Sequence, residues 1–367
     1  MNALAIPPRL LLGPGPGNLP PEVLAALAQP LLGHLDPVFL TLVEEVKEML
    51  RRVFRTANPV TFPVSGTGSA GMEAALVNLL QPGDRVLVAV NGVFGVRLAN
   101  LADRLGANTL RLESPWGRAF DRAAFLAAVA SERPRLACLV NGETSTGVWQ
   151  DPAGLAGPVH AAGGLLVVDC VTSLAGQEVA VDDWQADVVY AGTQKCLSCP
   201  PGLAPVTFSP RALEAFRART QPVPSFYLDL GEILKYLDAG GGRAYHHTAP
   251  ISMVYALHQA LSLVLDEGLE ARWQRHHDAA AQLITALAPL GFTPLVPEGE
   301  RLHPLTTLKL PAGLDEAGLR RRLLVEEGIE IGGGLGPLAG TIWRLSLIHI
   351  SEPTRLRRIS YAVFCLK

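Results

Sequence analysis

The sequence predicts an α/β protein with a large domain, built on a mostly parallel sheet flanked by helices, and a smaller C-terminal α+β domain. Short β-like runs alternate with stretches of helical period, which is the pattern of βαβ units. A long helical pattern from residue 253 separates this alternating part from a shorter second part. With 367 residues, 49% of them hydrophobic and 18% charged, the chain can bury a large core.

The strands of the large domain are expected at six apolar runs. Stretches rich in alanine, leucine and arginine, with helical period, separate them. Because strands connected through helices run parallel, most of this sheet should be parallel. The runs are RVLVAV (85–90), TLRLE (109–113), RLACLV (135–140), LLVVD (165–169), DVVYAG (187–192) and APVTFS (204–209).

The pattern that begins at residue 253 predicts two helices that meet near Gly268 and lead into the small domain. That domain should contain TTLKLP (306–311), DEAGLRRRLLVEEG (315–328) and GTIWRL (340–345). We therefore expect an N-terminal segment (1–17), a large domain (18–267), a small domain (268–345) and a tail (346–367).

Composition argues against several classes of protein. The net charge is −3 and no basic stripe carries interleaved aromatic residues, so neither nucleic acid nor an anionic membrane is an expected partner. Five cysteines, an odd number, suit reduced thiols better than a disulfide framework. The N-terminus is broken by Pro7 and Pro8 and makes a poor signal peptide, and no apolar run reaches membrane-spanning length. We expect a cytoplasmic protein.

Three polar features fall at the predicted carboxyl ends of strands, where open parallel sheets bind their ligands. The first is VSGTGSAGMEAAL (64–76), a glycine-rich turn that leads into a helix and could hold a phosphate. It also matches the dinucleotide fingerprint G-x-G-x-x-G, but the following strand ends at Asn91, where that fingerprint expects an acid. The other two features are Asp169 and Lys195, one of only five lysines in the chain.

Asp169 and Lys195 are open to two interpretations. They could form a structural ion pair, which also occurs in clefts. Alternatively, together with the glycine-rich turn they provide what pyridoxal 5′-phosphate (PLP) needs: an amine for a Schiff base, an anion for the pyridine nitrogen, and a phosphate cradle.

Several motifs, in order from about residue 8 to 345, resemble those of class V, fold-type I PLP-dependent aminotransferases of the alanine–glyoxylate (serine–pyruvate) group. They are LLGPGPGNLP, VSGTGSAGMEAALVNLLQPGD, NGVFG, GETSTGV, VVDCVTSL, GTQKCLSCPPGL, SFYLDL, YHHTAPISMVYAL and IGGGLGP followed by WRL.

The resemblance implies a role for each matching residue. Lys195 would carry the cofactor as a Schiff base and move protons, and Asp169 would pair with the pyridine nitrogen. The backbone amides of Gly68 and Ser69 would bind the phosphate, and Gln194 and Thr144 would hydrogen-bond the phosphate and the oxygen side of the ring. The implied reaction moves an amino group from alanine or serine to glyoxylate or pyruvate by a ping-pong mechanism.

The resemblance also implies contacts at the edge of the site. Phe94 would stack on the cofactor where the family often has tryptophan, and Arg344 would clamp the substrate carboxylate. Tyr245 and Thr248 would reach the phosphate of a partner subunit, which predicts a homodimer with shared sites. Arg243 receives no assignment.

Other functions are weighed against this one. CLSC (196–199) could suggest zinc, but no second cysteine pair accompanies it and small-residue packing explains it better. His246 and His247 are not expected to bind metal, because adjacent histidines on an irregular segment should point apart. A cysteine desulfurase would need a late nucleophilic cysteine, which the chain lacks between Cys199 and Cys365. A non-catalytic protein on the same fold, or a class V PLP enzyme with another substrate, stays open.

We expect the tail, SLIHISEPTRLRRISYAVFCLK (346–367), not to be native. The family pattern ends abruptly after WRL, where a glycine-containing turn and an amphipathic helix should follow. The tail is also distinctly basic, and it resembles a translated adapter fragment joined to a truncated reading frame.

Overall fold

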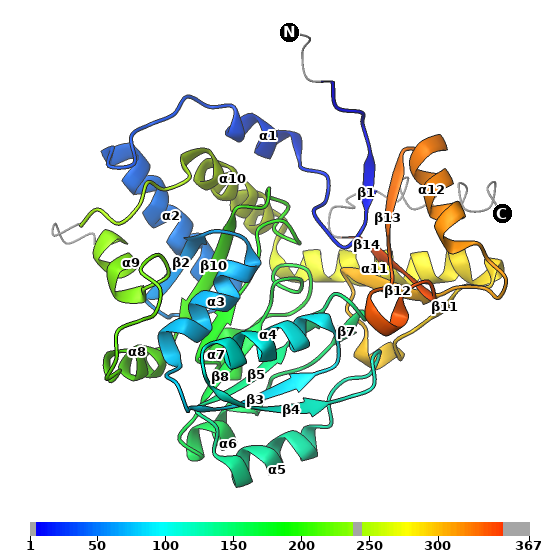
Figure 1. Ribbon diagram of the computed structural model, residues 1–367. Helices are drawn as coiled ribbons and strands as arrows, with labels where there is room; N and C mark the ends of the chain where they lie inside the picture. The colour runs from blue at the N-terminus through cyan, green and yellow to red at the C-terminus, as the bar shows by residue number, and fades with distance from the viewer. Residues whose placement is uncertain (1–4, 238–243, 348–367) are drawn as a thin grey trace.

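The computed structural model describes residues 5–237 and 244–347 of the chain (Figure 1). Its larger sheet has seven strands in the order β2-β10-β9-β8-β5-β3-β4. All neighbours from β4 to β9 pair in parallel, and β10 is antiparallel to both β9 and β2. The predicted α/β class is confirmed. The strands are β2 (Val60–Ser65), β3 (Arg85–Val90), β4 (Asn108–Glu113), β5 (Leu136–Val140), β8 (Leu165–Asp169), β9 (Val188–Tyr190) and β10 (Leu203–Phe208).

All six predicted strands of the large sheet are present, and the sequence analysis missed only β2 at its edge. Pro63 lies in the middle of β2, opposite Pro205 of β10. Because proline lacks a donor for the ladder, it is typical of edge strands and obscures their pattern.

Helices cover both faces of this sheet. Alternate strand residues point to opposite sides, and the apolar side chains on each face are buried by helices. Leu87 and Val168 belong to the core under α2, α5, α6 and α10, whereas Val86 and Val167 belong to the core under α3, α4, α8 and α9. The helices of this part are α1 (Pro21–Leu27), α2 (Pro37–Phe54), α3 (Gly68–Leu79), α4 (Val93–Arg104), α5 (Arg122–Glu132), α6 (Ala156–Ala161), α7 (Val181–Trp184), α8 (Pro210–Arg217), α9 (Leu230–Leu237) and α10 (Ile251–Glu267).

The second sheet has five strands in the order β1-β13-β14-β12-β11 and packs on helix α11 (Figure 1). As predicted, α10 and α11 meet at Gly268. The elements are β1 (Leu10–Leu12), α11 (Leu269–Leu287), β11 (Thr293–Pro294), β12 (Leu305–Lys309), α12 (Glu316–Glu326), β13 (Ile329–Gly333) and β14 (Ile342–Ser346), with the short hairpin β6 (Gly142–Glu143) and β7 (Val148–Trp149) elsewhere.

The N-terminal segment is part of this second sheet, which the sequence analysis did not foresee. Strand β1 pairs in parallel with β13, with Leu10 opposite Ile329. At the other end, Ser346 completes β14 and Leu347 is buried in the same core, so the first two residues of the expected tail belong to the fold. Residues 348–367 lie outside the described part, and the division into domains stays a prediction.

Within residues 5–237 and 244–347, no helix combines the length and apolar character that crossing a bilayer requires.

Apolar side chains of α11 that are buried against the second sheet should contribute to the free energy of unfolding. Leu283 is fully buried against this sheet, so Leu283→Ala should lower the free energy of unfolding by about 2–5 kcal/mol through lost burial and a cavity. Val325 on α12 is 68% exposed, and Val325→Ala serves as the control. Urea denaturation followed by circular dichroism measures both. Equal effects of the two substitutions would contradict this packing argument.

Candidate active site

A cavity lies at the carboxyl ends of the parallel strands. The predicted residues Gly68, Ser69, Phe94, Thr144, Asp169, Gln194 and Lys195 all line it. They come from α3, α4, the loop after β5, the end of β8 and the turn after β9. Because the strands are parallel, segments far apart in the sequence meet at this one edge.

Lys195 is buried on the turn that follows β9, and the N-terminal segment covers its amine. Its Nζ donates a hydrogen bond to the carbonyl of Pro14. A Cβ atom at Gly15 would lie 2.8 Å from this Nζ, and the φ of Gly15 is +115°, so only glycine suits this position. Burial lowers the pKa of Lys195 to about 8. The amine is therefore substantially neutral in mildly alkaline solution.

Asp169 ends β8 and is buried in the same cavity. The amide of Val171 donates to its Oδ1 at 2.8 Å, and burial raises the pKa of the carboxyl group to about 7. Across the part of the chain that the structure describes, no salt bridge joins Asp169 to Lys195. The interpretation of these two residues as a structural ion pair is therefore wrong.

The start of α3 offers a site for an anion. Its N-cap, Thr67, makes no side-chain capping hydrogen bond, and the first helical residues, Gly68 and Ser69, line the cavity. Helix N-termini with uncapped amides favour phosphate. Nearby, the buried Oε1 of Gln194 has no hydrogen-bond partner among residues 5–237 and 244–347, and a bound polar group would supply one.

The position of Phe94 depends on a buried carboxylate, Glu143, that the sequence analysis missed. Glu143 accepts hydrogen bonds from the amides of Phe94 (3.0 Å) and Gly95 (3.1 Å) and from the Ser145 hydroxyl (2.6 Å). A Cβ atom at Gly92 would lie 2.5 Å from the Glu143 side chain, so the loop can approach this closely only with glycine. The sequence does hold a signal for this residue. Glu143 lies within the motif GETSTGV, and a carboxylate stabilises the N-terminus of a helix.

Arg344 connects the second sheet to the cavity. It lies buried on β14, where its Nε donates to the carbonyl of Gly333 at 2.7 Å and its Nη1 donates to the carbonyl of Thr144 at 3.4 Å. Burial lowers its pKa. Thr144 is one of the cavity residues, so Arg344 lies beside the cavity without being among the residues that line it, and its contact with a substrate stays a prediction.

A second buried arginine, also missed by the sequence analysis, holds the loop that carries Lys195. Arg272, in the first turns of α11, donates through Nη2 to the carbonyl of Cys196 at 2.6 Å and through Nη1 to Glu267 at 2.5 Å. Ser198 in this loop has a φ of +56° and also accepts from Arg272. No local pattern could reveal this contact, because 76 residues separate its two ends.

Tyr245 and Thr248 lie outside the cavity of their own chain. Tyr245 is 67% exposed, and its hydroxyl is 3.3 Å from the Thr248 hydroxyl. Their contact with a partner subunit stays a prediction, and Arg243 lies outside the described residues. The expectation that His246 and His247 point apart is wrong, because their Nδ1 atoms are 2.7 Å from each other.

Cys196 and Cys199 are buried packing residues, as the sequence indicated. The thiol of Cys196 donates to the carbonyl of Thr172 at 3.2 Å, and burial raises its pKa to about 12. Burial likewise raises the pKa of Cys199, so both thiols stay protonated. Among the described residues, no group of three or more His, Cys, Asp or Glu side chains could hold a metal ion.

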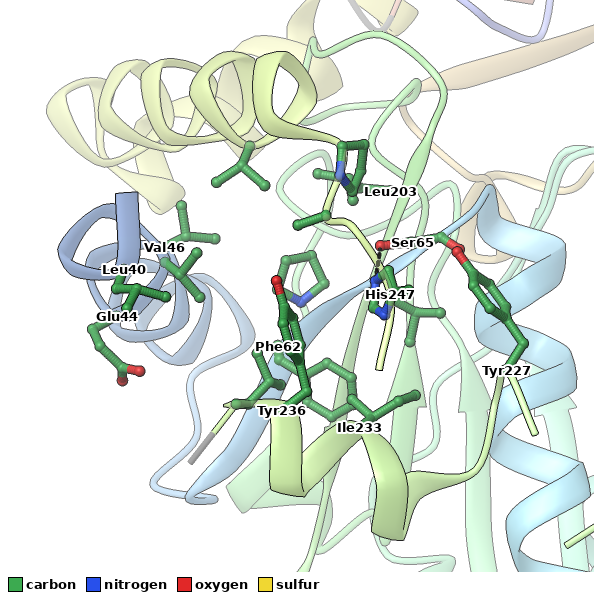
Figure 2. Close-up of a pocket in the computed structure, with 17 residues that line it drawn as sticks. Leu40, Glu44, Val46, Phe62, Ser65, Leu203, Tyr227, Ile233, Tyr236 and His247 are labelled. Atoms are coloured by element: carbon green, nitrogen blue, oxygen red, sulfur yellow. Dashed lines mark hydrogen bonds between the residues drawn. The ribbon is translucent and has the colours of Figure 1, made fainter. Parts of the chain in front are cut away.

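A separate, largely apolar pocket lies between α2, β2, α9 and α10 (Figure 2). Leu40 and Val46 of α2 lie on one side of it, and Ile233 and Tyr236 of α9 lie on another. The dashed line in Figure 2 marks a hydrogen bond between Ser65 Oγ and His247 Nε2, which are 2.8 Å apart. None of the predicted site residues lines it, so the chemistry is expected at the cavity that contains Lys195.

Comparison with known proteins agrees with this arrangement. Residues 10–348 match the family model described as aminotransferase class-V. The chain is 39% identical to alanine–glyoxylate aminotransferase of Mus musculus (96% of this chain and 85% of that protein). It is 36% identical to (S)-ureidoglycine–glyoxylate transaminase of Bacillus subtilis, covering 95% and 88%. The crystal structure of alanine–glyoxylate aminotransferase from Nostoc sp. superimposes with a TM-score of 0.97 at 43% identity, covering 100% of this chain and 97% of that one.

The lowered pKa of Lys195 predicts how its amine reacts. Only a neutral amine attacks an aldehyde, so reductive methylation of Lys195 by formaldehyde and borohydride should be half-maximal near pH 8, since the pKa is about 8. Mass spectrometry of peptides after reaction at a series of pH values gives the profile, with exposed Lys309 as the reference. If the two lysines show the same profile, burial does not lower the pKa of Lys195.

Proposed function

Since the chain belongs to the class V aminotransferase family, we propose that it moves an amino group from alanine or serine to glyoxylate or pyruvate by a ping-pong mechanism. It is a PLP-dependent transaminase with the fold-type I architecture. The observation that carries the proposal is the meeting of a buried amine, Lys195, with a buried carboxyl group, Asp169, that is not its salt-bridge partner. Both face one cavity beside the start of α3.

The residues of the cavity fit PLP. The uncapped start of α3 suits the phosphate, the unpartnered Oε1 of Gln194 suits a polar group, and Phe94 offers an aromatic face. Thr144, whose hydroxyl is 2.6 Å from that of Thr172, provides a further hydrogen-bonding group. When bound, PLP supplies an aldehyde for amines and a protonated ring that withdraws electrons from the substrate Cα.

Lys195 and Asp169 divide the work at the reacting atoms. Lys195, with its pKa near 8, would hold PLP through a neutral Nζ and, once the substrate amine had displaced it, its free amine would move a proton between two carbon atoms. Asp169, which lines the same cavity, would as a carboxylate favour the protonated form of the ring nitrogen if PLP were bound there.

Arg344 binds the substrate in this proposal. Its guanidinium is already fixed by the carbonyls of Gly333 and Thr144, so little side-chain entropy is lost when its remaining donors hold an α-carboxylate. The relatives named alanine–glyoxylate aminotransferases support small donors and acceptors. The B. subtilis relative, named for ureidoglycine, makes that compound the alternative donor.

The active form in this proposal is a homodimer. The exposed pair Tyr245 and Thr248 cannot serve the site of its own chain, because neither residue lines that cavity. A partner subunit placing this pair over the start of α3 would complete the phosphate site. The non-catalytic alternative is set aside, because the family and the relatives are transaminases.

The first test of this function is spectroscopic. Protein loaded with PLP should be yellow, and alanine or serine should shift its visible band, whereas Lys195→Ala should abolish turnover and keep the fold. The reason is that Lys195 provides both the attachment and the proton transfer. Absorbance and a coupled assay with glyoxylate measure these effects, with Lys309→Ala as the control. Retention of more than a trace of activity in Lys195→Ala would refute the mechanism.

The second test separates catalysis from stability at Asp169. Asp169→Asn should lower turnover by about 100-fold or more, because an amide cannot keep the ring nitrogen charged. In the cofactor-free protein the same change should be stabilising at about pH 8. The raised pKa means that the folded wild type binds more protons than the unfolded chain below about pH 7, so its stability falls as the pH rises through this window. The Asp169→Asn substitution removes that dependence.

Urea denaturation of the cofactor-free wild type and variant at about pH 4 and pH 8 gives the comparison. The stability gain should be largest at the higher pH and should nearly vanish at the lower one, where the Asp169 carboxyl group of the folded wild type is protonated. Near-normal turnover in the variant would instead return Asp169 to a purely structural role.

A further inference from the structure

Arg97 lines the cavity, but the roles proposed for Lys195, Asp169 and Arg344 do not involve it. We propose that Arg97 binds the phosphate group of the cofactor, together with Ser69 and the first amides of α3. The inference rests on the proposed function, because it assumes that PLP occupies the cavity. It adds to the site a cationic ligand that the sequence analysis did not identify.

Arg97 lies between Phe94 and Ser69, two residues that line the cavity. Arg97 follows Phe94 by one turn of α4, and its guanidinium carbon lies 4.9 Å from the centre of the Phe94 ring. Its Nη1 donates to the hydroxyl of Ser69, at the start of α3, over 3.3 Å. The side chain therefore extends from the proposed ring-stacking residue to the proposed phosphate site.

The charge of Arg97 is not neutralised by a neighbour. Within residues 5–237 and 244–347 Arg97 forms no salt bridge, and burial raises the pKa of Asp169 although the charge of Arg97 opposes that rise. A guanidinium held against an aromatic ring keeps its outer N–H groups free for an anion. Arginine can bind phosphate through two parallel hydrogen bonds and adds a full positive charge, whereas a helix N-terminus carries only a partial one.

Phosphate is favoured over the substrate carboxylate as the ligand of Arg97. Arg97 contacts Ser69 on α3, whereas Arg344 contacts Thr144, which lies on a different segment of the cavity lining. Arg97 therefore lies on the side of the cavity that holds the helix N-terminus, and the substrate side already has its own arginine.

The same helix offers a matched control. Arg104 lies on α4, is exposed like Arg97, and borders the same outer hollow between α3 and α4, but it does not line the cavity. Neutralising Arg104 changes the net charge of the protein and of this helix by the same amount. It leaves the proposed phosphate site intact.

The experiment compares two ligands that differ only in the phosphate. Cofactor-free protein is titrated with PLP and with pyridoxal, and the dissociation constants are measured from the change in absorbance. Arg97→Gln should weaken PLP binding by about tenfold, in the range of one charge-assisted hydrogen bond, and change pyridoxal binding by less than about twofold. Arg97→Lys should recover part of the loss, and Arg104→Gln should change neither constant.

Three outcomes would overturn the inference. Equal weakening of PLP and pyridoxal in Arg97→Gln would mean that Arg97 acts through the Phe94 ring. No weakening, with a raised KM for the amino acid, would assign Arg97 to the substrate. If the wild type binds neither ligand, the proposed function itself fails. Circular dichroism of each variant shows whether it is folded. If Arg97→Gln does not fold, the dissociation constants of Arg97→Lys for PLP and pyridoxal are compared instead.

Discussion

The arrangement depends on burying the amine of Lys195 without giving it a carboxylate. A buried ammonium ion normally takes an acidic partner, because an unpaired charge in the interior is costly. In the described part of the chain, Nζ donates its hydrogen bond to the carbonyl of Pro14, and Asp169 accepts one from the Val171 amide. The consequence is two groups whose pKa values move toward one another, to about 8 and about 7, which is the condition for acid–base chemistry near neutral pH.

Separate parts of the chain maintain this condition. The N-terminal segment, fixed by the pairing of β1 with β13, brings Pro14 and Gly15 over the lysine. Arg272 holds the carbonyl that follows Lys195, and Glu143 holds the backbone of Phe94. Helix α11 carries Arg272 and also packs against the second sheet. The position of Lys195 and the packing of that sheet therefore both depend on α11. Changes in this packing would therefore reach the amine through Arg272.

Tyr245 and Thr248, the residues predicted to reach a partner's phosphate, do not line the cavity of their own chain. Tyr245 and Thr248 lie on the segment that precedes α10 and borders the apolar pocket beside α2 and α9, and that segment also contributes His247 to the pocket (Figure 2). A protein that exposes a tyrosine next to apolar groups has a surface suited to another chain. Arg97 and Ser69 line both the cavity that contains Lys195 and the hollow between α3 and α4.

From the sequence alone follow six strands of the larger sheet with helical stretches between them, the meeting of α10 and α11 at Gly268, and the gathering of polar residues at the ends of β8 and β9. These depend on local period and on the rule that parallel strands end at one edge, so spacing suffices to predict them. The strand β2 was missed because Pro63 hides its pattern. Tertiary structure alone decided that Asp169 and Lys195 are not an ion pair, that β1 joins the second sheet, and that Glu143, Arg272 and Arg97 belong to the site. Each of these depends on a contact between side chains or strands distant in the sequence, and no local pattern encodes which distant groups burial will bring together.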